Sequence, residues 1–140
     1  MPLSIDEFPN SLTEPFVATS PKDFKYNCIG WACGTKTRMW PNMYSYYWPP
    51  GIPTIEDVNS FIELFQSKGY EVCDNGDLEK GYLKVAIYAY HDGKPSHAAR
   101  QLENGKWTSK LGVHQDVSHS IFSMSDGDYG NVVHYMRKPK

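Results

Sequence analysis

The chain has 140 residues, 40% of them hydrophobic and 21% charged, and a formal net charge of -2. This length suits a single domain, residues 1–140, that can bury a core without a metal or a disulfide framework. The charge disfavours a general nucleic-acid binder, which would carry a basic patch. No run of about 18 apolar residues occurs, so we expect no membrane partner and no membrane span.

The first 25 residues are rich in Pro, Ser and Thr and predict an extended N-terminal arm anchored by Phe16 and Phe24. They have neither a basic start nor an apolar run, so we do not expect them to act as a signal peptide. The odd number of cysteines, Cys28, Cys33 and Cys73, favours free thiols in a reducing compartment. We therefore expect a cytoplasmic protein, or one exported by a route without a cleaved signal peptide.

Two helices are expected next. The segment 26–34 (YNCIGWACG) predicts a short buried helix with Asn27 as N-cap, Cys28 in its first turn and Gly34 past its end. Residues 39–53 contain four prolines, so they form an aromatic loop rather than a regular element. Apolar residues at helical spacing then predict a second helix over 55–69, capped by Thr54.

The remainder predicts strands, beginning with Val85–Tyr90 and followed by segments at 97–102, 107–111 and 132–136. Asp-Gly and Asn-Gly dipeptides mark the first two turns. With a two-residue turn at 104–105, Leu102 pairs with Trp107, and Lys110 lies on the face of His97. Helices followed by an antiparallel meander predict an α+β fold.

Cys28 is the candidate nucleophile. A thiol at a helix N-terminus meets free N–H groups and a partial positive charge, which favour the thiolate and a later oxyanion. The alternative is a small buried apolar residue. His97 opens a strand downstream and is the candidate base, the alternative being a surface histidine on a hairpin. A thiolate–imidazolium pair would lower the pKa of Cys28 and raise that of His97.

A third residue should orient the imidazole, and Asp116 is our first choice. Its rivals are Ser109, His114 and His119. Asn27 and Lys110 are further candidates for a supporting role close to the catalytic pair.

The tracts YNCIGWACG, HAARQL and WTSKLG resemble an uncharacterised bacterial family of domains that is similar to papain-like (NlpC-type) cysteine hydrolases, which include cell-wall amidases. The resemblance covers 26–137. It implies a papain-like core in which a helix with the nucleophile, here Cys28, packs on a sheet that carries the histidine, here His97. The Asp-Cys-Ser/Gly tract of cell-wall amidases is replaced by Asn27-Cys28-Ile29, which argues against a peptidoglycan substrate.

The aromatic residues have two interpretations. In one, Trp40, Tyr47, Trp48 and Trp107 line a substrate cleft; in the other, the aromatic loop, which also holds Tyr44 and Tyr46, is simply pinned to the domain. No C-x-x-C pair and no phosphate-binding glycine motif occurs, so neither a metal nor a cofactor is expected.

The sequence thus predicts a thiol hydrolase for an amide or peptide bond, a papain-like peptidase or amidase. Glutamine deamidation or acyl transfer by the same residues is an alternative, as is an effector or toxin with a cognate inhibitor. A non-catalytic binding module with an aromatic surface is the alternative from another class.

Overall fold

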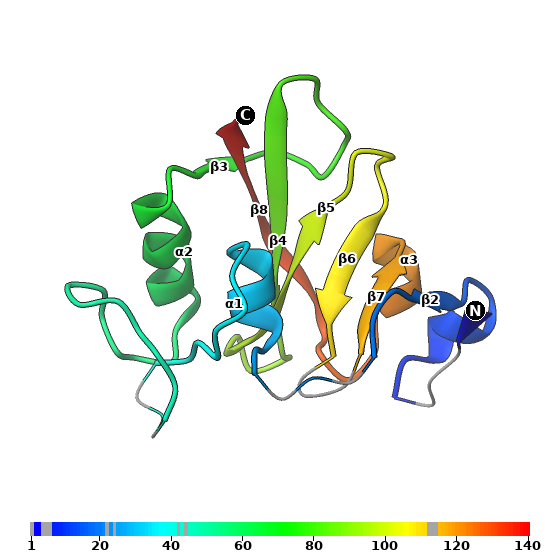
Figure 1. The fold of residues 1–140 in the computed structure, drawn as a ribbon, viewed down its shortest axis with the longest axis horizontal. Helices are drawn as coiled ribbons and strands as arrows, with labels where there is room; N and C mark the ends of the chain where they lie inside the picture. Colours follow the sequence, from blue (N-terminus) through cyan, green and yellow to red (C-terminus); the bar gives the residue numbers. More distant parts are fainter. Residues whose placement is uncertain are drawn as a thin grey trace.

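The fold is α+β and is built on one antiparallel sheet of eight strands (Figure 1). It is described from a computed structural model over residues 2–3, 7–21, 23, 25–41, 43, 45–111 and 115–140. In chain order the elements are β1 (Pro2–Leu3), the 3-10 helix η1 (Pro9–Leu12), β2 (Phe16–Ala18), α1 (Cys28–Ala32), α2 (Val58–Ser67), β3 (Glu71–Cys73), β4 (Tyr82–Ala89), β5 (Pro95–Gln101), β6 (Trp107–Lys110), β7 (Asp116–His119), α3 (Ile121–Met124) and β8 (Asn131–Pro139).

The strand order is β1-β2-β7-β6-β5-β4-β8-β3, in which β4 to β6 form the predicted hairpins and β7, a strand that was not predicted, continues the meander. The predicted final strand is confirmed as β8, which is longer than expected and pairs with both β4 and β3. The N-terminal arm is more ordered than predicted, because β2 extends the sheet beside β7. Phe16 is fully buried, as an anchor should be, whereas Phe24 lies outside the described residues.

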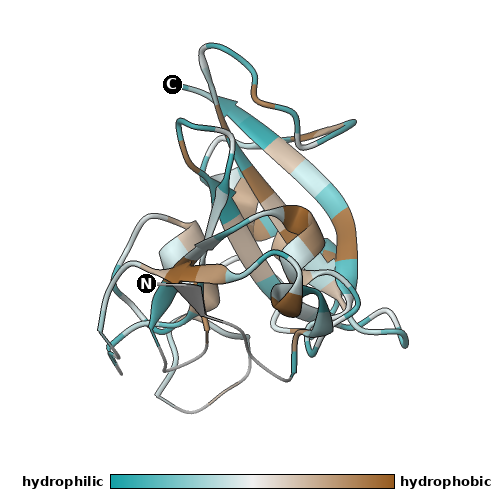
Figure 2. Cartoon of the chain, turned by 90° about the vertical axis from the view of Figure 1, so that its right-hand side faces the viewer, coloured by the Kyte–Doolittle hydropathy of each residue, from teal (hydrophilic) through white to brown (hydrophobic). Residues whose placement is uncertain are grey.

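Side chains of the sheet alternate between two hydrophobic clusters, one on each face. On one face, Val85, Ile87 and Ala98 pack with α1 and α2. On the other, Ala86, Tyr88 and Ala99 pack with α3 and the N-terminal segment, which together form the second cluster. Figure 2 shows β8 in hydrophobic and hydrophilic bands, with Met136 its buried core residue. A side chain of the sheet can therefore interact only with groups that lie on its own face.

The helix α1 confirms the prediction for 26–34. The Asn27 side chain accepts a hydrogen bond from the Gly30 amide, and Gly34 takes a left-handed backbone with φ 82° just past the end. The predicted start of the second helix is wrong: Asp57, not Thr54, caps α2 and accepts from the Asn59 amide. A carboxylate next to the first helical turn satisfies its free N–H groups there.

The β5–β6 hairpin differs from the predicted register by one residue. Gln101, not Leu102, pairs with Trp107, and Arg100 pairs with Thr108. The reason is Gly105, whose left-handed backbone (φ 85°) adds a third residue to the turn. Because a shift of one residue reverses every side chain, Lys110 moves away from the face of His97 and Ser109 takes its place.

Candidate active site

Cys28 begins α1, with its side chain only 6% exposed among the residues of the first cluster. Burial raises the pKa of Cys28 to about 12 and outweighs the nearby backbone amides of Ala98, Ile29 and Cys28 itself, which lower it. The predicted lowering of the thiol pKa is therefore wrong for this conformation, because no cation among the described residues offsets the loss of hydration.

His97 is fully buried on β5 and belongs to a chain of three hydrogen-bonded side chains, the His97 network (His97, Ser109 and His119). The Ser109 Oγ lies 2.9 Å from His97 Nε2 and 2.6 Å from His119 Nε2. His119 Nδ1 lies 2.8 Å from the carbonyl oxygen of Ser120. A seryl oxygen thus links two ring nitrogens, and the second imidazole is fixed by the main chain.

The positions of the protons follow from these partners. A carbonyl can only accept, so His119 Nδ1 carries a proton, and burial lowers the pKa of His119 to about 4, which leaves its Nε2 as an acceptor. Ser109 has a single hydroxyl proton and donates it to His119 at 2.6 Å. Ser109 must then accept from His97 Nε2–H. Neutral His97 therefore has a lone pair at Nδ1.

This Nδ1 atom is buried and has no hydrogen-bond partner among the described residues. Burial, and repulsion from His119 when that ring is protonated, hold the pKa of His97 well below its usual value, so the ring stays neutral. The ring stacks on Tyr129 with centroids 4.1 Å apart and meets the edge of Tyr88 with centroids 5.3 Å apart. The predicted rise of the His97 pKa is wrong here, because burial disfavours the charged ring and no anion among the described residues offsets it.

The structure does not join Cys28 and His97 directly. Cys28 packs with Ala98 on one face of the sheet, whereas His97 contacts Tyr88 and Tyr129 on the other. No thiol–imidazole hydrogen bond is found among the described residues. The two residues nevertheless lie next to the same part of β5, because Ala98, which packs with Cys28, directly follows His97.

Asp116 is not the partner of His97. It pairs with Lys110 across β6 and β7, and its Oδ2 accepts a hydrogen bond of 2.7 Å from the Tyr26 hydroxyl. The Lys110 ammonium lies 4.6 Å from the centroid of the Tyr26 ring. The expectation that Asp116 and Lys110 line the side of His97 is thereby corrected: the register gives that place to Ser109 and His119.

One known family model matches most of the chain. The model of a family described as "Domain of unknown function (DUF7689)" matches residues 17–137, from β2 to β8. The chain belongs to the DUF7689 family. Comparison with curated proteins and with solved structures finds no significant similarity.

In this DUF7689 domain, Asn27 has a structural role. Its side-chain oxygen accepts from the amides of Gly30 and Met39, and its nitrogen donates to the Met39 carbonyl at 2.8 Å. Asn27 thus ties the start of α1 to the aromatic loop. It forms no hydrogen bond with the His97 network in the described part of the chain.

The aromatic cleft is not formed as predicted. Trp40 and Trp48 both pack against Phe61 of α2, with ring centroids 5.1 and 5.4 Å away. Trp107 is buried on the face of the second cluster, and Tyr47 is half exposed. The loop is therefore pinned to the DUF7689 core, which is the structural interpretation. Tyr44 and His114 lie outside the described residues.

Tyr129 is a neighbour of His97 that the sequence did not indicate. Its ring stacks on His97, and burial raises its pKa. A turn signal at Gly127 and Gly130 flanks it, but nothing in the sequence points this turn at β5. The described residues contain no cluster of metal-ligating side chains, and none of their helices is long and apolar enough to span a membrane.

A pocket of about 240 Å³ adjoins this turn. It is lined by Tyr90, His91, Asp126, Gly127, Asp128, Gly130 and Asn131. The pKa of Tyr90 is raised by burial and by the charge of Asp128.

Proposed function

We propose that this DUF7689 domain is a papain-like cysteine hydrolase that cleaves an amide or peptide bond, with Cys28 as nucleophile and His97 as base. One observation carries the proposal: the neutral His97 ring is fixed at Nε2 and keeps an unpaired, buried lone pair at Nδ1. Leaving a buried acceptor unpaired costs about 1–3 kcal/mol. A general base needs such a lone pair, so a catalytic role would account for this cost.

The supporting residues have assignable roles. Ser109 accepts from His97 Nε2 and holds the tautomer that exposes the lone pair at Nδ1, which is the duty first expected of Asp116. His119, fixed by the Ser120 carbonyl, orients the Ser109 hydroxyl. The amides of Ala98 and Ile29 that reach the sulfur would stabilise the thiolate or the oxyanion formed on attack.

The proposed reaction uses a neutral pair. His97 Nδ1 takes the thiol proton as the Cys28 sulfur attacks the carbonyl carbon. The C–N bond then breaks, the nitrogen leaves with that proton, and a thioester remains. Water, deprotonated by His97, hydrolyses the thioester and regenerates the thiol. With glutamine as substrate the same steps release ammonia, and with an amine in place of water they transfer the acyl group.

The described conformation is a closed one for this reaction. The thiol is 6% exposed and the imidazole is fully buried, so neither meets a substrate without movement. Tyr129 stacks on the His97 ring and has to move first. Because His97 and Cys28 face opposite sides of β5, we propose that the turn of Tyr129 opens toward the pocket at Tyr90 and that the start of β5 then turns to bring Nδ1 to the face of the thiol.

An activated ester tests the assignment. p-Nitrophenyl acetate should give a burst of p-nitrophenolate and an acetyl group on Cys28, located by peptide mass mapping. Cys28→Ala should abolish the burst, and His97→Gln should slow acetylation by at least about 100-fold. The matched control is Cys73→Ala, which removes a partly buried thiol remote from His97 and should leave the burst unchanged.

Acetylation of Cys73 alone, or a burst that survives Cys28→Ala, would show that the domain is no thiol hydrolase. In that case the non-catalytic binding module becomes the better account of the fold, and the burial of Cys28 is merely structural.

A further inference from the structure

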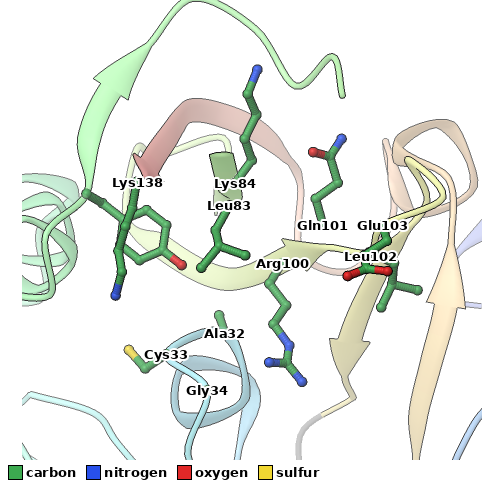
Figure 3. Close-up of a pocket in the computed structure, with 11 residues that line it drawn as sticks. Ala32, Cys33, Gly34, Leu83, Lys84, Arg100, Gln101, Leu102, Glu103 and Lys138 are labelled. Atoms are coloured by element: carbon green, nitrogen blue, oxygen red, sulfur yellow. The ribbon is translucent and has the colours of Figure 1, made fainter. Parts of the chain in front are cut away.

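A second pocket, of about 310 Å³, lies between the end of α1 and the strands β4, β5 and β8 (Figure 3). It is lined by Ala32, Cys33, Gly34, Tyr70, Leu83, Lys84, Arg100, Gln101, Leu102, Glu103 and Lys138. No member of the His97 network lines it. The pocket is therefore separate from the site proposed for hydrolysis and has to be explained on its own chemistry.

Arg100 supplies unused hydrogen-bond donors to this pocket. Its guanidinium lies over the Trp31 ring, with Cζ 4.3 Å from the centroid, and its Nε is buried without a partner. In the described part of the chain no carboxylate lies within ion-pair distance of it. Gly34 leaves room beside the group, since a Cβ there would come only to 4.0 Å from Nη1. A guanidinium so placed can donate to an anion through a planar fork.

The other charges of the pocket favour an anionic ligand. Lys138, whose Nζ lies 5.4 Å from the centroid of the Tyr70 ring, forms no ion pair among the described residues. Lys84 is already paired with Glu79 at 3.4 Å. Arg100 and Lys138 together outweigh the Glu103 carboxylate at the rim, so the pocket carries a net positive charge that attracts an anion.

The walls between these charges are apolar. Figure 3 shows Leu83 between Arg100 and Lys138, above Ala32 and Cys33. Leu83 keeps 39% of its surface exposed, which leaves apolar area for a ligand to cover. A volume of about 310 Å³ fits a small molecule with an apolar body.

We propose that this pocket binds a small organic carboxylate. The carboxylate lies on the Arg100 guanidinium, the apolar body covers Leu83 and Tyr70, and the charge of Lys138 adds attraction without a required direct contact. The proposal does not depend on catalysis at Cys28.

The test uses 3-phenylpropionate, titrated into the ¹⁵N-labelled domain and followed by amide chemical shifts. We expect saturable shifts at residues 32–34 and 100–103, and at least about tenfold weaker binding of the neutral 3-phenylpropionamide, which cannot form charge-assisted bonds. Binding should also weaken as salt is raised.

Variants assign the binding to these side chains. Arg100→Gln and Leu83→Asp should each raise the Kd at least about tenfold. The Kd of Arg100→Lys should lie between those of Arg100→Gln and the wild type. Lys106→Gln makes the same charge change as Arg100→Gln at an exposed turn outside the pocket and should leave the Kd within about twofold. Unchanged shifts outside the pocket establish that each variant is folded.

The proposal is overturned by shifts that do not saturate or map elsewhere, by equal binding of the amide, or by equal effects of Lys106→Gln and Arg100→Gln. Should Leu83→Asp unfold the domain, the comparison of Arg100→Gln with Lys106→Gln still decides.

Discussion

At the scale of single residues, both candidate catalytic groups are held neutral by burial rather than charged by each other. Burial raises the pKa of Cys28 to about 12 and holds the pKa of His97 well below 6.5. A helix N-terminus was expected to lower the thiol pKa, but α1 has only five residues and its amides do not replace the lost hydration. Under the proposed function, the pair would therefore react by concerted proton transfer and not as a preformed ion pair.

This difference predicts the pH dependence of Cys28 acetylation by p-nitrophenyl acetate. Above pH 6.5 His97 is already neutral, so the wild-type rate should stay nearly flat from about pH 6.5 to 8.5. In His97→Gln only the thiolate reacts, and its fraction rises about tenfold per pH unit below its pKa of about 12. The rate in that variant should therefore climb across the same range.

Initial rates of p-nitrophenolate release, measured in both proteins across this range, separate the two routes. If the wild-type rate also rises tenfold per unit, His97 accepts no proton from Cys28 and is not the base.

At the scale of elements, the start of α1 depends on the absence of a side chain at Gly30. A Cβ on Gly30 would lie 1.8 Å from the carbonyl oxygen of Thr37, which belongs to backbone rather than to a flexible side chain. Alanine has a better helix propensity than glycine. We nevertheless expect Gly30→Ala to reduce the free energy of unfolding by about 3 kcal/mol or more, because the main chain must shift to accept it.

Urea unfolding followed by far-UV circular dichroism measures this change. Gly81→Ala is the comparison, since it has open space around its Cβ position and a left-handed φ of 86°. It should cost only the roughly 1–2 kcal/mol of backbone strain. A Gly30→Ala variant that loses no more stability than Gly81→Ala would contradict the close contact.

The sequence was sufficient for elements whose signals are local. The Asn27 cap, Gly34 and the meander from β4 to β6 follow from capping, turn residues and alternation, and each was predicted. The partner of His97 was not, because it depends on whether the turn at Asn104-Gly105 has two or three residues. One left-handed glycine reverses the whole of β6 and exchanges Lys110 for Ser109 beside the imidazole.

Contacts between distant segments were beyond the sequence for a different reason. Tyr129 contacts His97 from the turn that follows α3. Phe16, in the strand that the N-terminal arm adds to the sheet, packs against His119 with ring centroids 5.8 Å apart. Neither arrangement has a periodicity or a spacing that marks it. The resemblance to papain-like hydrolases predicts a Cys on a helix that packs against a strand with a His, and α1 and β5 do supply those two elements. A Cys–His pair also requires the imidazole on the face of the sheet that meets the helix, and His97 lies on the other face.

At the scale of the whole molecule, the His97 network joins β5, β6 and β7 inside the core, so its protonation is coupled to folding. The unfolded chain binds a proton at each histidine near pH 6.5, whereas the folded domain keeps His119 neutral down to a pKa of about 4. The unfolded state binds more protons in that range. The stabilising contribution of the neutral histidine is therefore fully present above about pH 6.5, and the free energy of unfolding falls as the pH drops. The lowered pKa of His97 acts in the same direction.

We therefore predict that the free energy of unfolding decreases between pH 6.5 and about 4, with His119 alone contributing about 3 kcal/mol of the loss. His119→Gln retains an amide group that can reach the Ser109 hydroxyl but cannot take up this proton. Its unfolding free energy should be lower than that of the wild type at pH 7 yet decline less steeply with acid. The exposed His91→Gln serves as the control, and its decline should parallel the wild type. Urea denaturation at pH 7, 6, 5 and 4.5 gives the slopes. Parallel slopes for His119→Gln and the wild type would mean that His119 is not kept neutral in the folded core, and the proton assignment that leaves a lone pair on His97 would lose its foundation.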